Sequence, residues 1–143
     1  MANRSFYPLK GSLTQGVVLL CGKWTFNADE SGAVDDVRSY GLTVGSLDAD
    51  GTQLLTLNER YAALLSVQCN VTKDFSDGGA ATTFPVSEPS LVELNSQAVA
   101  TSAKTIDLQY IKVEDGDQQT RGNLAGQTVY CRILLKLSSV GGA

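Results

Sequence analysis

"GVVLLCGKWTFNADESGA", residues 16–33, joins an apolar strand pattern to a polar turn. Alternate residues of a β-strand point to opposite faces, and the first half of this stretch is apolar on both faces. We therefore expect a strand that is covered from both sides. The Asn, Asp, Ser and Gly residues that follow it favour a reversal of the chain. The stretch thus predicts a buried strand that ends in a turn.

The same period of two recurs along most of the chain. Residues 67–72 alternate between apolar side chains (Val67, Cys69, Val71) and polar ones, as a half-exposed antiparallel strand does. The stretch VYCRILLKL, residues 129–137, has the strongest alternation and predicts a central strand. In the strand that begins near residue 106, the apolar phase changes after Tyr110, which indicates a bulge.

Two segments depart from this pattern. In LNERYAALL, residues 57–65, Asn58 is a suitable cap and Tyr61 and Leu64 share a helical face, which predicts one or two helical turns. Residues 75–104 are rich in Ala, Ser, Thr, Gly and Pro, with only a weak strand candidate at 91–94. They predict a long loop, and loops of this length are usually functional or disordered.

These elements predict an all-β fold, an antiparallel β-sandwich or jelly-roll of about seven to eight strands with one short helix. A chain of 143 residues is the size of one ordinary domain. We divide it into an N-terminal arm, residues 1–15, and a single sandwich domain, residues 16–143, that carries the long loop at about 75–104.

Composition narrows the function classes. The formal net charge is −4 and the basic residues lie singly along the chain, which argues against nucleic acid binding. No apolar run is long enough to span a membrane, and the opening MANRSFYPLK lacks the pattern of a secretory signal. The three cysteines cannot all pair, and we interpret them as reduced, small core residues rather than as a disulfide with a spare thiol. We expect a protein that works in a reducing compartment, without a membrane partner.

The chain contains no histidine, which removes the commonest general base and the commonest metal ligand. We expect a protein that is not an enzyme and has no cofactor or metal. The acidic clusters at 48–50 (DAD) and 114–117 (EDGD) lack the further ligands of a calcium loop, so we interpret them as turns, with metal binding as the alternative. Trp24 is a candidate sugar-stacking residue, but its place in an alternating strand favours a core position.

The arm carries the most distinctive candidate contact residues. Phe6, Tyr7, Pro8 and Leu9 precede the first regular strand in an otherwise polar segment. Aromatic side chains on an arm are good anchors for a partner. Alternatively, the arm folds back over its own sandwich. The candidate interface residues are completed by three from the long loop: Phe75, Phe84 and Pro85.

The order of these features resembles the capsid decoration, or cement, proteins of tailed bacteriophages. The resemblance rests on VVLLCGKWTF followed by NADESGA, on LLTLNERYAALLSVQCNV, and on TIDLQYIKVED leading to VYCRILLKLSSV. It implies a virion protein with no catalytic residues, made in the bacterial host cytoplasm and bound to the major capsid protein on the outer surface of the head.

Such a protein benefits from assembling as a homo-oligomer, a dimer or trimer, because several weak contacts then act together. We expect the arm and the long loop to bind the capsid shell. The alternatives are a tail, neck or fibre component of the virion and, from a different class, a carbohydrate-binding module.

Overall fold

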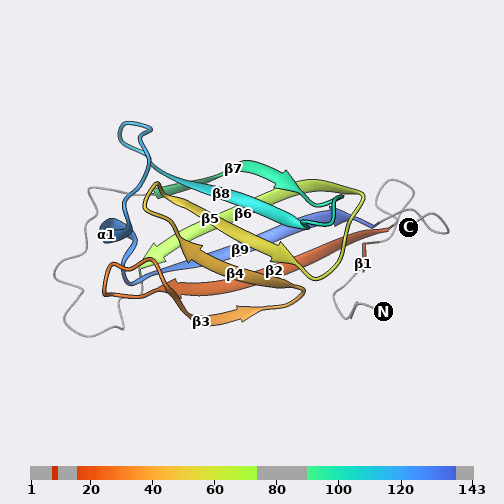
Figure 1. Cartoon of the computed structure of the whole chain (residues 1–143), viewed down its shortest axis with the longest axis horizontal. Helices are drawn as coiled ribbons and strands as arrows, with labels where there is room; N and C mark the ends of the chain where they lie inside the picture. Colours follow the sequence, from red (N-terminus) through yellow and green to blue (C-terminus); the bar gives the residue numbers. More distant parts are fainter. Residues whose placement is uncertain (1–7, 10–15, 74–89, 138–143) are drawn as a thin grey trace.

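The computed structural model describes residues 8–9, 16–73 and 90–137. Two antiparallel sheets pack face to face, which confirms the predicted all-β sandwich (Figure 1). Sheet A contains β1 (Pro8–Leu9), β2 (Val17–Phe26), β3 (Val34–Ser39), β6 (Ala63–Lys73) and β9 (Gln127–Lys136). Sheet B contains β4 (Leu42–Leu47), β5 (Thr52–Leu57), β7 (Ser90–Ala98) and β8 (Thr105–Lys112). The helix α1 (Arg121–Leu124) precedes β9.

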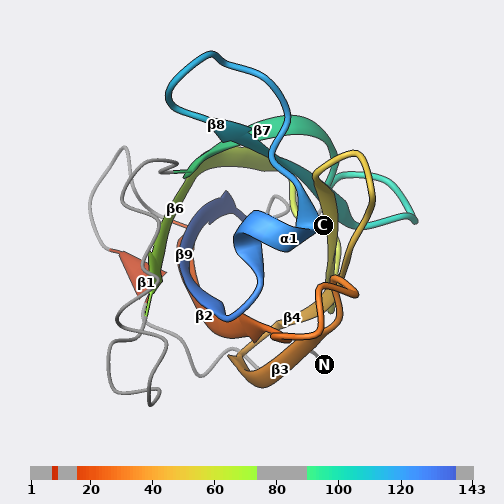
Figure 2. The same ribbon diagram turned by 90° about the vertical axis from the view of Figure 1, so that its left-hand side faces the viewer.

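The strand order brings distant parts of the chain together. In sheet A, β9 lies between β2 and β6, while β1 and β3 pair with different parts of the other edge of β2. This confirms the prediction that the last strand is central. In sheet B the order is β4-β5-β8-β7. The sheets curve around a shared interior, and they meet where β3 lies beside β4 and β6 beside β7 (Figure 2).

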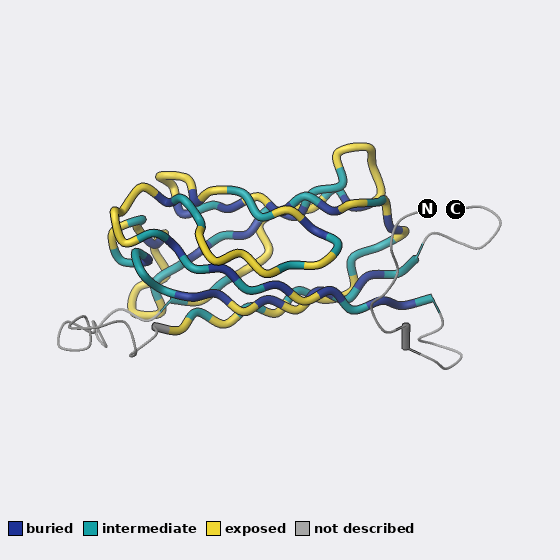
Figure 3. The backbone as a smooth tube through the Cα atoms, turned by 90° about the horizontal axis from the view of Figure 1, so that it is seen from below, coloured by how far each residue is buried: buried dark blue, intermediate teal, exposed yellow. Residues whose placement is uncertain are grey.

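The inward faces of both sheets form one apolar core. Buried and exposed residues alternate along the strands (Figure 3). The register between β2 and β9 sets Leu20 opposite Ile133 and Trp24 opposite Val129, and all four are buried. Trp24 is fully buried, which confirms its core assignment. From sheet B, Tyr110 packs edge-on against Phe26, with the ring centroids 5.6 Å apart.

The outward face of β2 is less covered than its sequence predicts. Val17 is buried and Leu19 is half-buried, but Cys21 is exposed. Sheet B packs only against the inward face, so the expectation of a strand covered on both sides is met only at its beginning.

The predicted helix at residues 57–65 is wrong. This segment contains the last residue of β5, a turn, and the start of β6, where Ala63 pairs with Lys136 and Leu64 with Leu135. One or two helical turns gain few hydrogen bonds, whereas the strand pairs with β9 along its whole length. The spacing of Tyr61 and Leu64 has another cause, because both side chains pack into the core from a turn and a strand.

Two further expectations are corrected. Residues 90–98, within the range predicted as a long loop, form β7, which pairs with β8 along its length. The remaining residues of that range up to 89 lie outside the described part. The predicted bulge also lies elsewhere, because the register shift falls in β7 between Leu94 and Ser96, not in β8 after Tyr110. A sequence cannot show which of two partner strands holds the extra residue.

One polar side chain is fully buried at a strand irregularity. The β4–β5 register shifts between Val44 and Leu47, and the Gln53 Nε2 donates to the Gly45 carbonyl oxygen there at 2.9 Å. The Tyr110 hydroxyl donates in turn to the Gln53 Oε1 at 2.6 Å. Gln53 and Tyr110 are both completely inaccessible to solvent. The pair therefore links β4, β5 and β8 inside an apolar core.

We predict that Tyr110→Phe lowers the free energy of unfolding by about 1 to 3 kcal/mol, because the Gln53 Oε1 would stay buried without its donor. Urea denaturation followed by Trp24 fluorescence measures this change. Tyr130→Phe is the matched control, since Tyr130 is 49% exposed. A Tyr110→Phe protein as stable as the control would contradict the role assigned to this hydrogen bond.

Candidate functional site

Strand pairing gathers a set of polar side chains on the outer face of sheet A. Lys23 of β2 lies opposite Arg38 on one side and Tyr130 on the other. In the next row, Arg132 of β9 lies between Cys21 and Gln68. These residues line a surface depression of about 370 Å³, which we call the basic groove: Cys21, Lys23, Arg38, Gln68, Tyr130 and Arg132.

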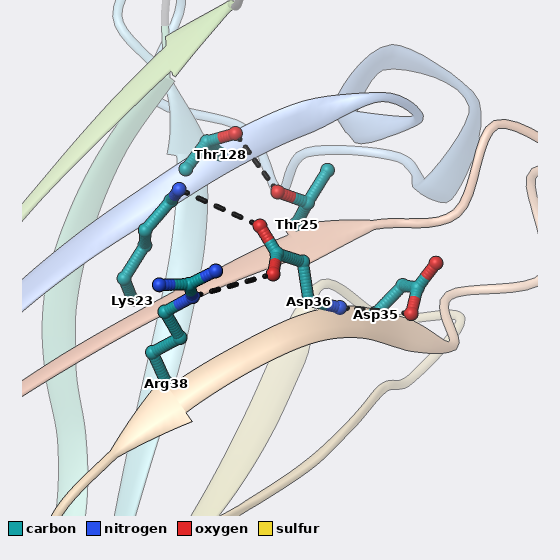
Figure 4. Close-up of polar contacts among 6 residues, drawn as sticks. All are labelled: Lys23, Thr25, Asp35, Asp36, Arg38 and Thr128. Carbon is teal, nitrogen blue, oxygen red and sulfur yellow. Dashed lines mark hydrogen bonds and ion pairs between the residues drawn. The ribbon is translucent and has the colours of Figure 1, made fainter.

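A bulge brings one carboxylate to the edge of this groove. The β2–β3 register shifts between Lys23 and Thr25, and Asp36 has a left-handed backbone with φ of 46°. A bulge of this kind redirects a side chain. The Asp36 carboxylate lies 3.5 Å from both the Lys23 Nζ and the Arg38 Nε (Figure 4). In the adjoining row of sheet A, the Thr25 and Thr128 hydroxyl oxygens are 2.9 Å apart.

Arg132 carries the uncompensated charge of the groove. Its Nη2 donates to the Gln68 Oε1 at 2.5 Å, and among the described residues no carboxylate pairs with it. Lys23 lies over the Tyr130 ring, 6.0 Å from its centroid. The groove thus contains three cationic side chains and has one carboxylate at its edge, that of Asp36. The Arg132 guanidinium is held in place by Gln68, which is uncharged. This arrangement can bind an anionic group without first breaking an ion pair of Arg132.

The cysteines differ in their surroundings. Cys131 is buried and Cys69 is half-buried against the core, as expected, but Cys21 is exposed in the groove, so the core assignment was wrong for this residue. Cys69 and Cys131 are directly opposite on β6 and β9, with their sulfur atoms 3.0 Å apart. The hydrogen bond with Cys69, together with burial, raises the pKa of the Cys131 thiol well above its ordinary range. All three are free thiols in the structure.

The acidic clusters have the geometry of turns. The Asp50 Oδ1 accepts a hydrogen bond from the Thr52 hydroxyl at 2.7 Å, and this bond lowers the pKa of Asp50. The Asp115 Oδ1 accepts one from the Asp117 backbone N–H at 3.0 Å. Within the described ranges, no three acidic or cysteine side chains are grouped so that they could hold a metal ion.

Few of the contact residues predicted from the sequence can be located. Phe6, Tyr7, Phe75, Phe84 and Pro85 lie outside the described residues.

The other two predicted contact residues form β1. Pro8 pairs with Val18 and Leu9 with Val17, so at these two positions the arm does fold back onto its own sheet.

The sequence reasoning missed the basic groove. Lys23, Tyr130 and Arg132 occupy the outward positions of predicted strands, which was a usable signal. Their proximity, however, depends on the β2–β9 pairing.

No protein-family model, curated protein or solved structure matches this chain. In the part of the chain that the structure describes, no helix has the length and apolar character needed to cross a membrane.

We predict that iodoacetamide modifies Cys21 first in the native protein and leaves Cys131 unmodified until the protein unfolds. Only an accessible thiolate reacts, and Cys131 is both buried and hard to deprotonate. Peptide mass spectrometry at successive times, with a urea-unfolded sample as the control, measures the order. Equal rates for Cys21 and Cys131 in the native protein would contradict the structure.

Alkaline pH should destabilise the fold. The pKa of the Cys131 thiol is raised above its ordinary value of 9.0, and burial raises that of the Tyr110 hydroxyl above 10.0. The unfolded chain therefore loses these protons first as the pH rises. The stabilisation is complete below the unfolded pKa values and falls above them, by up to about 1.4 kcal/mol per pH unit for each group. The urea midpoint of the wild-type protein should fall as the pH rises above 9, and that of Cys131→Ala should fall less steeply. Equal slopes for the two proteins would contradict this role of Cys131.

Proposed function

We propose that the protein is a capsid decoration protein of a tailed bacteriophage, a non-enzymatic homo-oligomer that binds the outer surface of the major capsid protein shell. The observation that carries a binding role is the exposed outer face of sheet A, where Tyr130 and Arg132 project from paired strands. Tyrosine and arginine are the residue types that contribute most to protein interfaces. Because the surface is built on strands, little conformational entropy is lost when a partner binds.

The assignment to a capsid is supported by the resemblance of the sequence. The described residues of the stretches that carry it lie in β2, β5, β6, β8 and β9 and in the turns that adjoin these strands. Three of these strands are the neighbours that bear the outer face. The net charge of −4 also suits the outside of a shell better than the side that faces DNA.

A tail, neck or fibre component of the virion is the alternative, and it uses the same kind of surface. The hypothesis of a carbohydrate-binding module loses its main support, because Trp24 has no exposed surface on which a sugar could stack.

We predict that the recombinant protein co-sediments with expanded phage heads that lack it, and that deleting residues 1–12 weakens this binding. Since the deletion also removes β1, Phe6→Ala with Tyr7→Ala is the sharper variant, because it leaves Pro8 and Leu9 to pair with β2. The two substitutions should weaken head binding at an unchanged urea midpoint. Unchanged binding would reject the role of the arm.

The position of the protein on the virion is measured by a separate experiment. Immunogold labelling of intact particles should mark the head surface. Labelling confined to the tail would replace the decoration role with the alternative, and absence of label from every virion structure would overturn both.

A further inference from the structure

The structure contains a second feature whose charge complements that of the basic groove. The turn 113–118 connects β8 to the segment before α1 and projects from the end of the sandwich (Figures 1 and 2). All six of its residues are exposed, and it carries Glu114, Asp115 and Asp117. Val113, at its start, is 57% exposed. The turn therefore presents three carboxylates beside one apolar side chain.

This turn has an ordered base. The Lys112 N–H donates to the Asp117 carbonyl oxygen at 2.8 Å, and the Gly116 N–H donates to the Lys112 carbonyl oxygen at 2.9 Å. Ile111 forms a β-bridge with Gln118 just below. A projection held in this way keeps its carboxylates in place before it meets a partner, which lowers the entropic cost of docking.

The basic groove offers the matching groups. Lys23, Arg38 and Arg132 supply three positive charges, and the exposed Tyr130 ring supplies an apolar surface for Val113. Turn and groove cannot meet within one molecule, because the turn extends from sheet B and the groove lies on the outward face of sheet A. A contact between the turn and the groove would therefore join two different copies.

We propose that the acidic turn 113–118 of one copy docks in the basic groove of another, so that the protein assembles into a homo-oligomer through this contact. This deepens the homo-oligomer part of the proposed function by naming the interface. A dimer that places groove against groove is disfavoured, because it would bring the cations of one copy against those of the other, whereas a two-fold dimer with the turn of each copy in the groove of the other pairs opposite charges. A head-to-tail contact pairs opposite charges and, where its rotation closes, makes a ring.

Charge reversal tests the pairing in purified protein without phage heads. Arg132→Glu should reduce the mass in solution to that of the monomer, 15.1 kDa, and so should the triple variant Glu114→Lys, Asp115→Lys, Asp117→Lys. Adding Lys23→Glu and Arg38→Glu to these four substitutions makes the groove acidic opposite a basic turn, and this combined variant should assemble again. Glu93→Lys, on the exposed edge strand β7, is the control and should leave the mass unchanged. Sedimentation velocity measures each mass, and near-ultraviolet circular dichroism of Trp24 confirms that each variant is folded.

Several outcomes would overturn the proposal. They are a monomeric wild-type protein at about 0.05 M salt, where charges are weakly screened, an Arg132→Glu protein that still assembles, and a combined variant that remains monomeric. If Arg132→Glu abolishes head binding while the wild-type protein is monomeric, the groove binds the shell instead, and the decoration role survives without this interface.

The exposed Cys21 allows a direct test of contact. Asp115→Cys puts a thiol on the turn, and diamide, an azo oxidant that takes up two electrons and two protons, would join it to Cys21 of the neighbouring copy as both thiols lose their hydrogens. A non-reducing gel should show a ladder whose largest closed species gives the number of copies. Ser102→Cys, on the exposed turn after β7, is the matched control and should give no such ladder. A ladder that persists in Asp115→Cys with Cys21→Ser would contradict the contact.

Discussion

The register between β2 and β9 is the constraint on which the rest of this protein depends. It sets Trp24 beside Val129 and Leu20 beside Ile133 on the inward face. Because strand side chains alternate, a slip of one residue would exchange the two faces and expose the core. The same register sets Lys23 beside Tyr130 and Cys21 beside Arg132 on the outward face. The pairing of β2 with β9 thus places the core residues on the inward face and the groove residues on the outward face.

Apolar side chains are buried between the two sheets, whereas charged side chains lie on the outer face of sheet A, and this distribution suits a binding protein. The interior is mostly apolar, and its buried polar residues include Gln53, which provides the hydrogen bond that the irregular β4–β5 ladder leaves unmade at Gly45. That side chain is held by Tyr110, whose ring also packs on Phe26 from the opposite sheet. Tyr110 therefore joins the two sheets by packing, while its hydrogen bond links strands within sheet B. A rigid pair of sheets allows the outer face to keep its geometry when a partner binds.

The basic and acidic surface groups are associated with different sheets. The basic groove lies on sheet A, and the acidic turn 113–118 extends from sheet B. Self-association that joins these surfaces neutralises charge at each contact while the chain as a whole remains acidic. For a protein on the outside of a phage head, such contacts would link copies across the shell, so that the binding of each copy supports that of its neighbours.

The sequence by itself determined the strand class, the central position of the last strand and the core position of Trp24, because period-two alternation reports directly which side chains face the interior. It did not determine that residues 57–65 avoid a helix, because this depends on the ladder with β9, which is far away in the chain. For β7 it indicated only a weak strand candidate at 91–94, and the ladder with β8 extends that strand over residues 90–98. The groove likewise required the tertiary structure. Lys23 and Arg132 are separated by more than a hundred residues, and only strand pairing decides that they lie on the same surface.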